Sequence, residues 1–142
     1  MQKELQDFEE EIASYCNINY AIGVGNATDA LEMAFYLTGI DKGDEVILPS
    51  HTMTATPSSA HLHGGVPIFV DVDEEGFMNV DLIEEKITEK TKYIVPVQLN
   101  GRTSKMENIL RISEKYNIKI IEDSAQGLGS KYKNKQAGTF GV

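Results

Sequence analysis

The chain has 142 residues, a length that suits one domain with a sizeable core or a piece of a larger domain. Hydrophobic residues make up 41% and charged residues 25%, which is ordinary for a soluble globular protein. The formal net charge of −9 argues against a nucleic-acid partner, and the single cysteine, Cys16, excludes an intrachain disulfide.

The N-terminal segment is acidic and amphipathic, unlike a signal or transit peptide, and no apolar run approaches membrane-spanning length. We therefore expect no membrane association and a cytoplasmic location. Asp71 to Gly76 is similar to the start of a calcium loop, but Leu82 occupies the twelfth position, where such loops need a glutamate. No metal site is predicted.

Apolar residues at helical spacing predict an amphipathic helix over 3–16. A second helix begins near Asn26 or Thr28, either of which can cap it, and stops at Gly39. The remaining predicted helices cover 54–63, 82–89 (capped by Asp81) and 106–116, and the predicted strands cover 20–24, 45–48, 66–70, 93–97 and 118–121.

Strands and helices alternate along nearly the whole chain, a pattern typical of βαβ units. We therefore predict an α/β fold with three α/β/α layers and a mostly parallel sheet. Residues 127–142 are rich in glycine, and the chain ends at Val142 with no closing helix. This ending suggests that residues 1–142 are part of a larger domain.

The turn at Gly25 to Thr28 lies between a predicted strand and a helix. Backbone N–H groups at a helix start bind phosphate well, and the small Ala27 side chain lets a phosphate approach the main chain. An ordinary capped helix explains the same residues equally well. A Rossmann dinucleotide site ranks lower, because the third glycine is replaced by Thr28 and the acidic residue after the second strand is missing.

Ile120 to Gln126 (IIEDSAQ) places Asp123 at the carboxyl end of a predicted strand, where open parallel sheets bind ligands. A buried carboxylate there needs a cationic partner or several donors. The pyridinium nitrogen of pyridoxal phosphate is such a partner, and Gln126 can bond the hydroxyl edge of the ring. Met53, after an earlier strand, can pack on a cofactor face. The alternatives are a turn-capping Asp123 and a core Met53.

Four segments in order resemble the sugar aminotransferases of the DegT/DnrJ/EryC1/StrS family, which belong to the pyridoxal-phosphate enzymes of fold type I. They are FEEEIASYCNINYAIGVGNATDAL, GDEVILPSHTMTATPSSAHLHGGVPIFVDVD, YIVPVQLNGR and IIEDSAQGLGSKYKNKQAGTFG. The resemblance implies that the chain is part of the large, cofactor-binding domain. It also implies a homodimeric parent that moves an amino group from glutamate or glutamine to the keto group of a nucleotide-linked sugar.

By this resemblance, Ala27 and Thr28 hold the cofactor phosphate, Met53 stacks on the ring, Asp123 pairs with the pyridine nitrogen and Gln126 lies beside the ring. Ala27 replaces the family's usual glycine, and Met53 replaces its usual aromatic residue. The first change narrows the phosphate pocket, and the second implies either looser packing on the ring or a different subset of substrates.

The family's Schiff-base lysine follows shortly after a GTFG segment, and here the sequence ends at Gly141-Val142. The small C-terminal domain of the family is also missing. No lysine of this chain is assigned the catalytic role, and we expect the chain alone to be inactive. Two alternatives stay open: a nucleotide-sugar 3-dehydratase, with histidine in place of that lysine, and a catalytically inactive truncated relic. A Rossmann-type NAD oxidoreductase ranks third.

Overall fold

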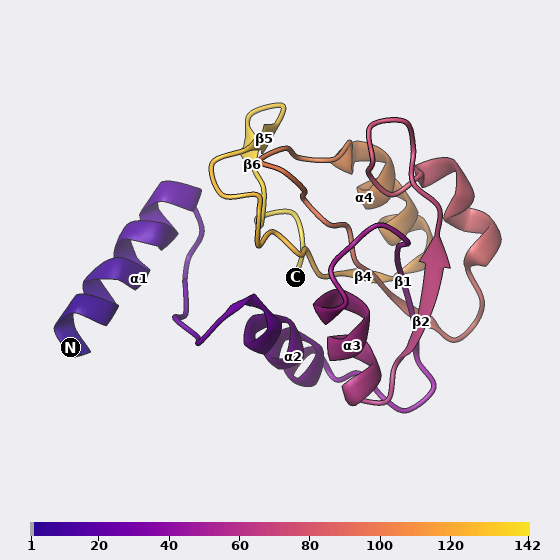
Figure 1. Cartoon of the computed structure of the whole chain (residues 1–142), viewed down its shortest axis with the longest axis horizontal. Helices are drawn as coiled ribbons and strands as arrows, with labels where there is room; N and C mark the ends of the chain where they lie inside the picture. Colours follow the sequence, from indigo (N-terminus) through magenta and orange to yellow (C-terminus); the bar gives the residue numbers. More distant parts are fainter. Residues whose placement is uncertain (1) are drawn as a thin grey trace.

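The computed structural model describes residues 2–142 (Figure 1). The helices are α1 (Gln2–Cys16), α2 (Ala27–Thr38), α3 (Ala55–Leu62) and α4 (Met106–Tyr116), with short 3₁₀ turns at Val80–Leu82 and Glu84–Lys86. The main strands are β1 (Glu45–Pro49), β2 (Val66–Val70), β3 (Thr91–Ile94) and β4 (Lys119–Ile120), and a small hairpin follows, formed by β5 (Lys131–Tyr132) and β6 (Lys135–Gln136).

The four main strands form one sheet in the order β2-β1-β3-β4, and every neighbouring pair is parallel. From β1, the chain passes to β2 on one side of β1 and then to β3 on its other side, so the direction in which strands are added to the sheet reverses at β1. Parallel strands place all their carboxyl ends on one edge of the sheet, and ligands bind at such reversal points. The prediction of a mostly parallel sheet is confirmed.

Helices pack on both faces of this sheet through apolar side chains, which gives the three predicted layers. One core faces α2 and α3 and contains Leu31, Phe35, Val46, Leu48, Ala60, Tyr93, Val95 and Ile121. The other faces α4 and the 3₁₀ turns and contains Ile47, Val70, Met78, Ile83, Ile94, Met106, Ile109, Ile112, Ile118 and Ile120. Neighbouring residues such as Val46 and Ile47 alternate between the two cores because successive strand side chains point to opposite faces.

Helix α2 has both of its predicted ends. Asn26 is the residue that caps it, and its side chain accepts the amide N–H of Asp29 at 3.0 Å. Gly39 ends the helix in the left-handed conformation with φ of 78°, which glycine adopts without the penalty of a Cβ atom. Both ends of α2 are thus determined by local sequence.

The predicted strand over 20–24 is wrong. This segment is not part of either sheet, and Tyr20 and Ile22 are exposed. The amide N–H of Gly23 instead donates to Glu9 of α1 at 2.6 Å. β-prone residues form a strand only where another strand offers hydrogen bonds, and in the described part of the chain none lies beside this one.

The predicted helix over 82–89 is also wrong, because the two short 3₁₀ turns replace it. Asn79, not Asp81, caps the first turn, and its side chain accepts the N–H of Asp81 at 3.1 Å. Thr88 then bonds Glu45 through its hydroxyl at 2.5 Å and turns the chain into β3. Two 3₁₀ turns and the Thr88 contact with Glu45 thus occupy the segment that was predicted as one helix.

The ladders of β3 and β4 are shorter than predicted. β3 ends at Ile94, although Val97 still makes an isolated parallel bridge to Asp123. Pro96 lies between the two pairings and has no N–H to donate, which interrupts the ladder without ending the extended conformation.

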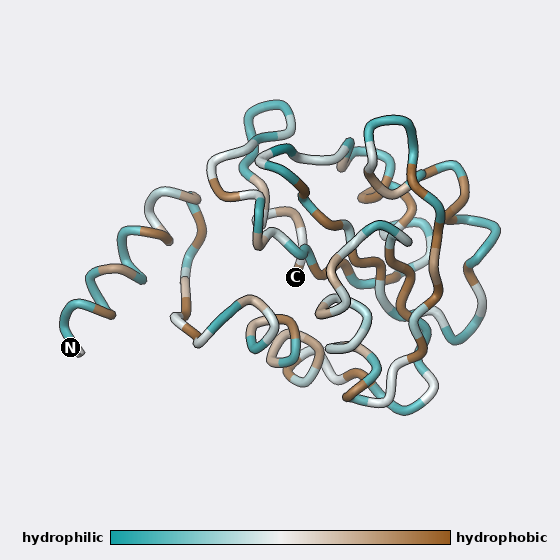
Figure 2. The backbone as a smooth tube through the Cα atoms, in the orientation of Figure 1, coloured by the Kyte–Doolittle hydropathy of each residue, from teal (hydrophilic) through white to brown (hydrophobic). Residues whose placement is uncertain are grey.

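Helix α1 stands apart from the sheet and its covering helices, joined to α2 by an extended connection (Figure 1). Figure 2 shows hydrophobic segments along the strands of the main body. Leu5, Phe8 and Tyr15 of α1 are exposed, and the C-terminal end of the helix contacts the hairpin, where the Gln136 side chain donates to the Tyr15 carbonyl. In residues 2–142, no helix is long and apolar enough to cross a bilayer.

Candidate cofactor-binding site

The backbone N–H and carbonyl groups of Asp123 both form hydrogen bonds with the neighbouring extended segment at 96–98. Its amide N–H donates to the carbonyl of Pro96 at 3.0 Å, and its carbonyl accepts the N–H of Gln98 at 2.8 Å. Asp123 therefore continues the parallel pairing past the end of β4. The sheet places this carboxylate at the edge where ligands bind.

A cavity of about 170 Å³ lies at this edge, and all the predicted site residues line it: Ala27, Thr28, Met53, Asp123 and Gln126. The rest of the lining is mostly apolar and includes Leu31, Val97 and Leu99. A second hollow of about 350 Å³ adjoins it and shares Ala27, Leu31, Asp123 and Ala125. The structure thus brings together residues that lie as far apart in sequence as Ala27 and Gln126.

The Asp123 side chain is 7% exposed, and its two oxygens differ in their partners. The hydroxyl of Thr56 donates to Oδ2 at 2.6 Å, and the amide N–H of Ala125 donates to Oδ1 at the longer distance of 3.3 Å. No cationic side chain among residues 3–142 pairs with this carboxylate. A buried carboxylate with spare acceptor capacity suits a protonated ring nitrogen.

Gln126 is fixed through its carbonyl end. The amide N–H of Asn100 donates to Gln126 Oε1 at 3.0 Å, and the N–H of Gly101 donates to the Gln126 main-chain carbonyl at 3.0 Å. Because Oε1 accepts this bond, the side-chain NH₂ group is left to donate to a ligand. A cofactor hydroxyl or phenolate oxygen fits such a donor.

The start of α2 supplies unpaired backbone donors at the cavity. The Asn26 cap takes the N–H of Asp29, and within residues 2–142 no acceptor lies on the N–H of Ala27 or Thr28. Both residues line the cavity. Free N–H groups and the positive end of the helix dipole favour a phosphate there.

Met53 lies at the rim of the cavity and is 65% exposed. It follows β1 in the loop before α3, as the sequence predicted. An exposed, flexible thioether covers a ring less rigidly than a buried aromatic side chain.

Thr56 is the functional candidate that sequence reasoning missed. Its side chain is fully buried at the start of α3, and its hydroxyl also lies 2.8 Å from the hydroxyl of Thr52. Two threonines four residues apart after a strand end were the available signal. That signal alone does not reveal that Asp123, 67 residues later, is the acceptor.

Glu122, beside Asp123, holds the glycine-rich end of the chain against the sheet. Its carboxylate accepts the side-chain NH₂ of Gln98 at 2.9 Å and the backbone N–H groups of Gly138 at 3.0 Å and Phe140 at 2.6 Å. Gly138 and Gly141 consequently line the second hollow. Gly138, Gly141 and Val142 thus lie along the hollow that adjoins the cavity.

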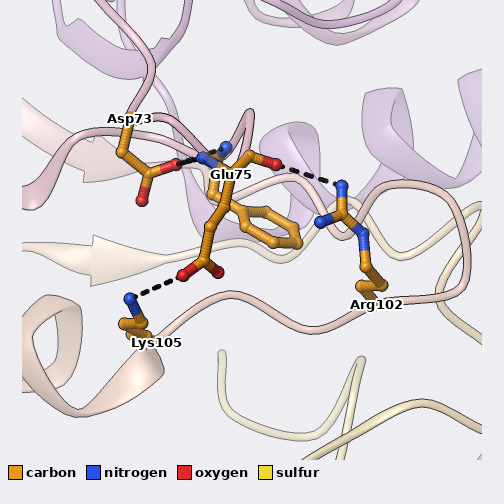
Figure 3. A network of polar contacts seen from close by, with 5 residues as sticks. Asp73, Glu75, Arg102 and Lys105 are labelled. Carbon is orange, nitrogen blue, oxygen red and sulfur yellow. Dashed lines mark hydrogen bonds and ion pairs between the residues drawn. The ribbon is translucent and has the colours of Figure 1, made fainter.

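A polar network joins the loops that follow β2 and β3 (Figure 3). Arg102 donates to the carbonyl of Glu75 at 3.1 Å and lies over the ring of Phe77, while Lys105 pairs with the Glu75 carboxylate at 2.9 Å (Figure 3). The hydrogen bond from Lys105 to the Glu75 carboxylate raises the pKa of Lys105. Among the described residues, no lysine lines the cavity, so none is placed to bind a cofactor covalently.

A parallel sheet with a buried carboxylate, an amide donor and an open helix start around one cavity defines a cofactor-binding α/β domain. The chain belongs to the DegT/DnrJ/EryC1/StrS aminotransferase family, whose model matches residues 1–142. GDP-perosamine synthase of Escherichia coli O157:H7 is 45% identical over 138 residues, which are 96% of this chain. The chain spans 38% of the length of that relative.

Two solved structures have the same fold as this chain. The aminotransferase from Psychrobacter cryohalolentis superposes with a TM-score of 0.95 and 40% identity over 98% of this chain and 35% of its own. NtdA from Bacillus subtilis, with bound cofactor PMP, gives a TM-score of 0.88 and 39% identity over 94% of this chain and 31% of its own. The predicted fold class and family resemblance are both confirmed.

Proposed function

We propose that residues 1–142 are part of the large domain of a sugar aminotransferase and bind pyridoxal phosphate, while the lysine segment and small domain of the family lie outside them. The observation that carries this proposal is that one cavity is lined by Ala27, Thr28, Met53, Asp123 and Gln126. The cofactor PMP in the NtdA structure supports the choice of ligand.

Each residue has a separate part in binding. The N–H groups of Ala27 and Thr28 and the Thr28 hydroxyl hold the phosphate. The Asp123 carboxylate keeps the ring nitrogen protonated, Gln126 donates to the ring's hydroxyl edge, and Met53 covers one face of the ring. When bound, the cofactor supplies an electron sink for the transfer of an amino group.

For the whole protein, we propose transfer of an amino group from glutamate or glutamine to a keto group on a nucleotide-linked sugar, in a cytoplasmic homodimer. The name of the GDP-perosamine synthase relative supports this substrate class. The products then enter surface polysaccharide or natural-product synthesis. A 3-dehydratase differs, by the family resemblance, at the lysine position that follows the GTFG segment.

The binding proposal predicts that the chain takes up pyridoxamine 5′-phosphate and binds phosphate-free pyridoxamine about five- to thirty-fold more weakly, because phosphate contacts with the helix start contribute about 1–2 kcal/mol. Fluorescence titration measures both affinities. Thr28→Val should weaken only the phosphorylated ligand. Thr38→Val, at the other end of α2 with its hydroxyl on Ala34, is the matched control. Equal affinity for the two ligands would contradict the phosphate assignment.

We also expect no transamination by this chain alone. It should form no amino sugar when mixed with pyridoxal phosphate, glutamate and a keto-sugar nucleotide, because no lysine among the described residues lines the cavity. Mass spectrometry of the sugar nucleotide, against a mixture without protein, measures the product. Protein-dependent amination would disprove this expectation.

A further inference from the structure

The hydroxyl groups of Thr52 and Thr56 form a chain that ends on Asp123. Thr56 Oγ1 lies 2.6 Å from Asp123 Oδ2 and 2.8 Å from Thr52 Oγ1. Thr56 is 0% exposed and Asp123 is 7% exposed, so water competes little for these bonds. Thr52, which is half-buried, also lines the cavity.

The charge on Asp123 determines the direction of both bonds. An ionised carboxylate only accepts, so the single hydroxyl proton of Thr56 points to Asp123. Thr56 Oγ1 must then accept the proton of Thr52, although either hydroxyl satisfies the distance by itself. Bonds aligned in one direction towards a charge polarise and strengthen each other.

We infer that Thr56, supported by Thr52, is a positioning residue that holds Asp123 in one orientation for the ring nitrogen of the cofactor. This inference rests on the proposed binding of pyridoxal phosphate. The Thr56 bond occupies Oδ2, whereas Oδ1 receives only the 3.3 Å contact from the Ala125 amide. Oδ1 therefore keeps more of its acceptor capacity for the ring N–H.

The main test compares Thr56→Val, which removes the hydroxyl at nearly the same volume, with Thr56→Ser, which retains it. Each variant is titrated with pyridoxamine 5′-phosphate and with the analogue in which a C–H group replaces the ring nitrogen. Thr56→Val should weaken the first ligand by about ten-fold and leave the analogue within about two-fold, because only the first ligand uses the carboxylate. Thr56→Ser should restore binding.

A cycle with Asp123→Asn separates positioning from general damage to the fold. In the Asp123→Asn background, Thr56→Val should change affinity by less than about two-fold, since the interaction that it supports is already lost. Equal losses for both ligands, or an undiminished loss in the Asp123→Asn background, would overturn the inference. Where Thr56→Val does not fold, Thr52→Val should weaken the first ligand alone by about three-fold, and an unchanged affinity overturns the inference.

A measurement without cofactor distinguishes failure of this inference from failure of the proposed function. Three-bond NMR couplings should show one χ1 rotamer for Asp123 in the parent chain and in Thr56→Ser, and averaged rotamers in Thr56→Val. A single, unchanged rotamer in Thr56→Val overturns the positioning role. Failure of the unsubstituted chain to bind pyridoxamine 5′-phosphate refutes the proposed function, and the rotamer result still decides whether Thr56 orients Asp123.

Discussion

Asparagine in place of Asp123 is expected to weaken binding of pyridoxamine 5′-phosphate by about 100-fold, because it leaves a protonated ring nitrogen without its buried counter-charge. The free energy of unfolding should change much less, since the asparagine carbonyl can still accept the hydroxyl of Thr56. In the unsubstituted chain this hydroxyl lies 2.6 Å from Asp123 Oδ2. Fluorescence titration gives the affinity, and urea unfolding of the same sample gives the stability.

The matched control is Asp7→Asn, the same change at an exposed position of α1. It alters net charge equally and should leave affinity within about two-fold, because exposed charges far from a ligand are screened. Equal affinities for Asp123→Asn and the unsubstituted chain would disprove the assignment of Asp123 to the ring nitrogen. Equal losses in both variants would instead indicate a non-specific charge effect.

Truncation of Phe35 to alanine should lower the free energy of unfolding by about 3–5 kcal/mol. Phe35 is 0% exposed on the sheet side of α2, and its ring meets that of Tyr93 edge-on at 5.6 Å between centroids. The substitution leaves a cavity where α2 docks on β3. Ligand affinity should also fall, because α2 carries Ala27 and Thr28 to the site.

Tyr36→Ala is the control, since it removes an aromatic ring from the next residue of the same helix. Tyr36 is 72% exposed, so its loss should change the free energy of unfolding by no more than about 0.5 kcal/mol. Urea unfolding measures both variants. A loss for Phe35→Ala no greater than that for Tyr36→Ala would show that α2 is not anchored through Phe35.

Local pattern was enough to predict elements whose determinants lie within a few residues. Helix α2 is the clearest case, with its cap at Asn26 and its stop at Gly39. Helix α4 matched its predicted bounds, because its apolar residues repeat at helical spacing. The segments 20–24 and 82–89 failed for the opposite reason. A strand at 20–24 requires a neighbouring strand, and none lies beside it in residues 2–142. Segment 82–89 is followed by the long-range bond from Thr88 to Glu45.

The sequence by itself determined the alternation of strands and helices, and with it the parallel sheet whose carboxyl ends form a ligand-binding edge. It also predicted Thr28, Asp123 and Gln126 as site residues from their positions at element ends, and all three line the cavity. Short-range spacing and capping carry that information, because they depend on backbone geometry within one turn or strand.

Only the tertiary structure decided which side chains complete the site. The donor to Asp123 is Thr56 and the donor to Gln126 Oε1 is the amide of Asn100, contacts that arise because strand order brings separate loops to one edge. Such pairings depend on sheet topology and burial, which the local spacing of apolar residues in the sequence does not predict. In this protein, local sequence placed Asp123 at a strand end, and the tertiary structure buried its carboxylate beside Thr56.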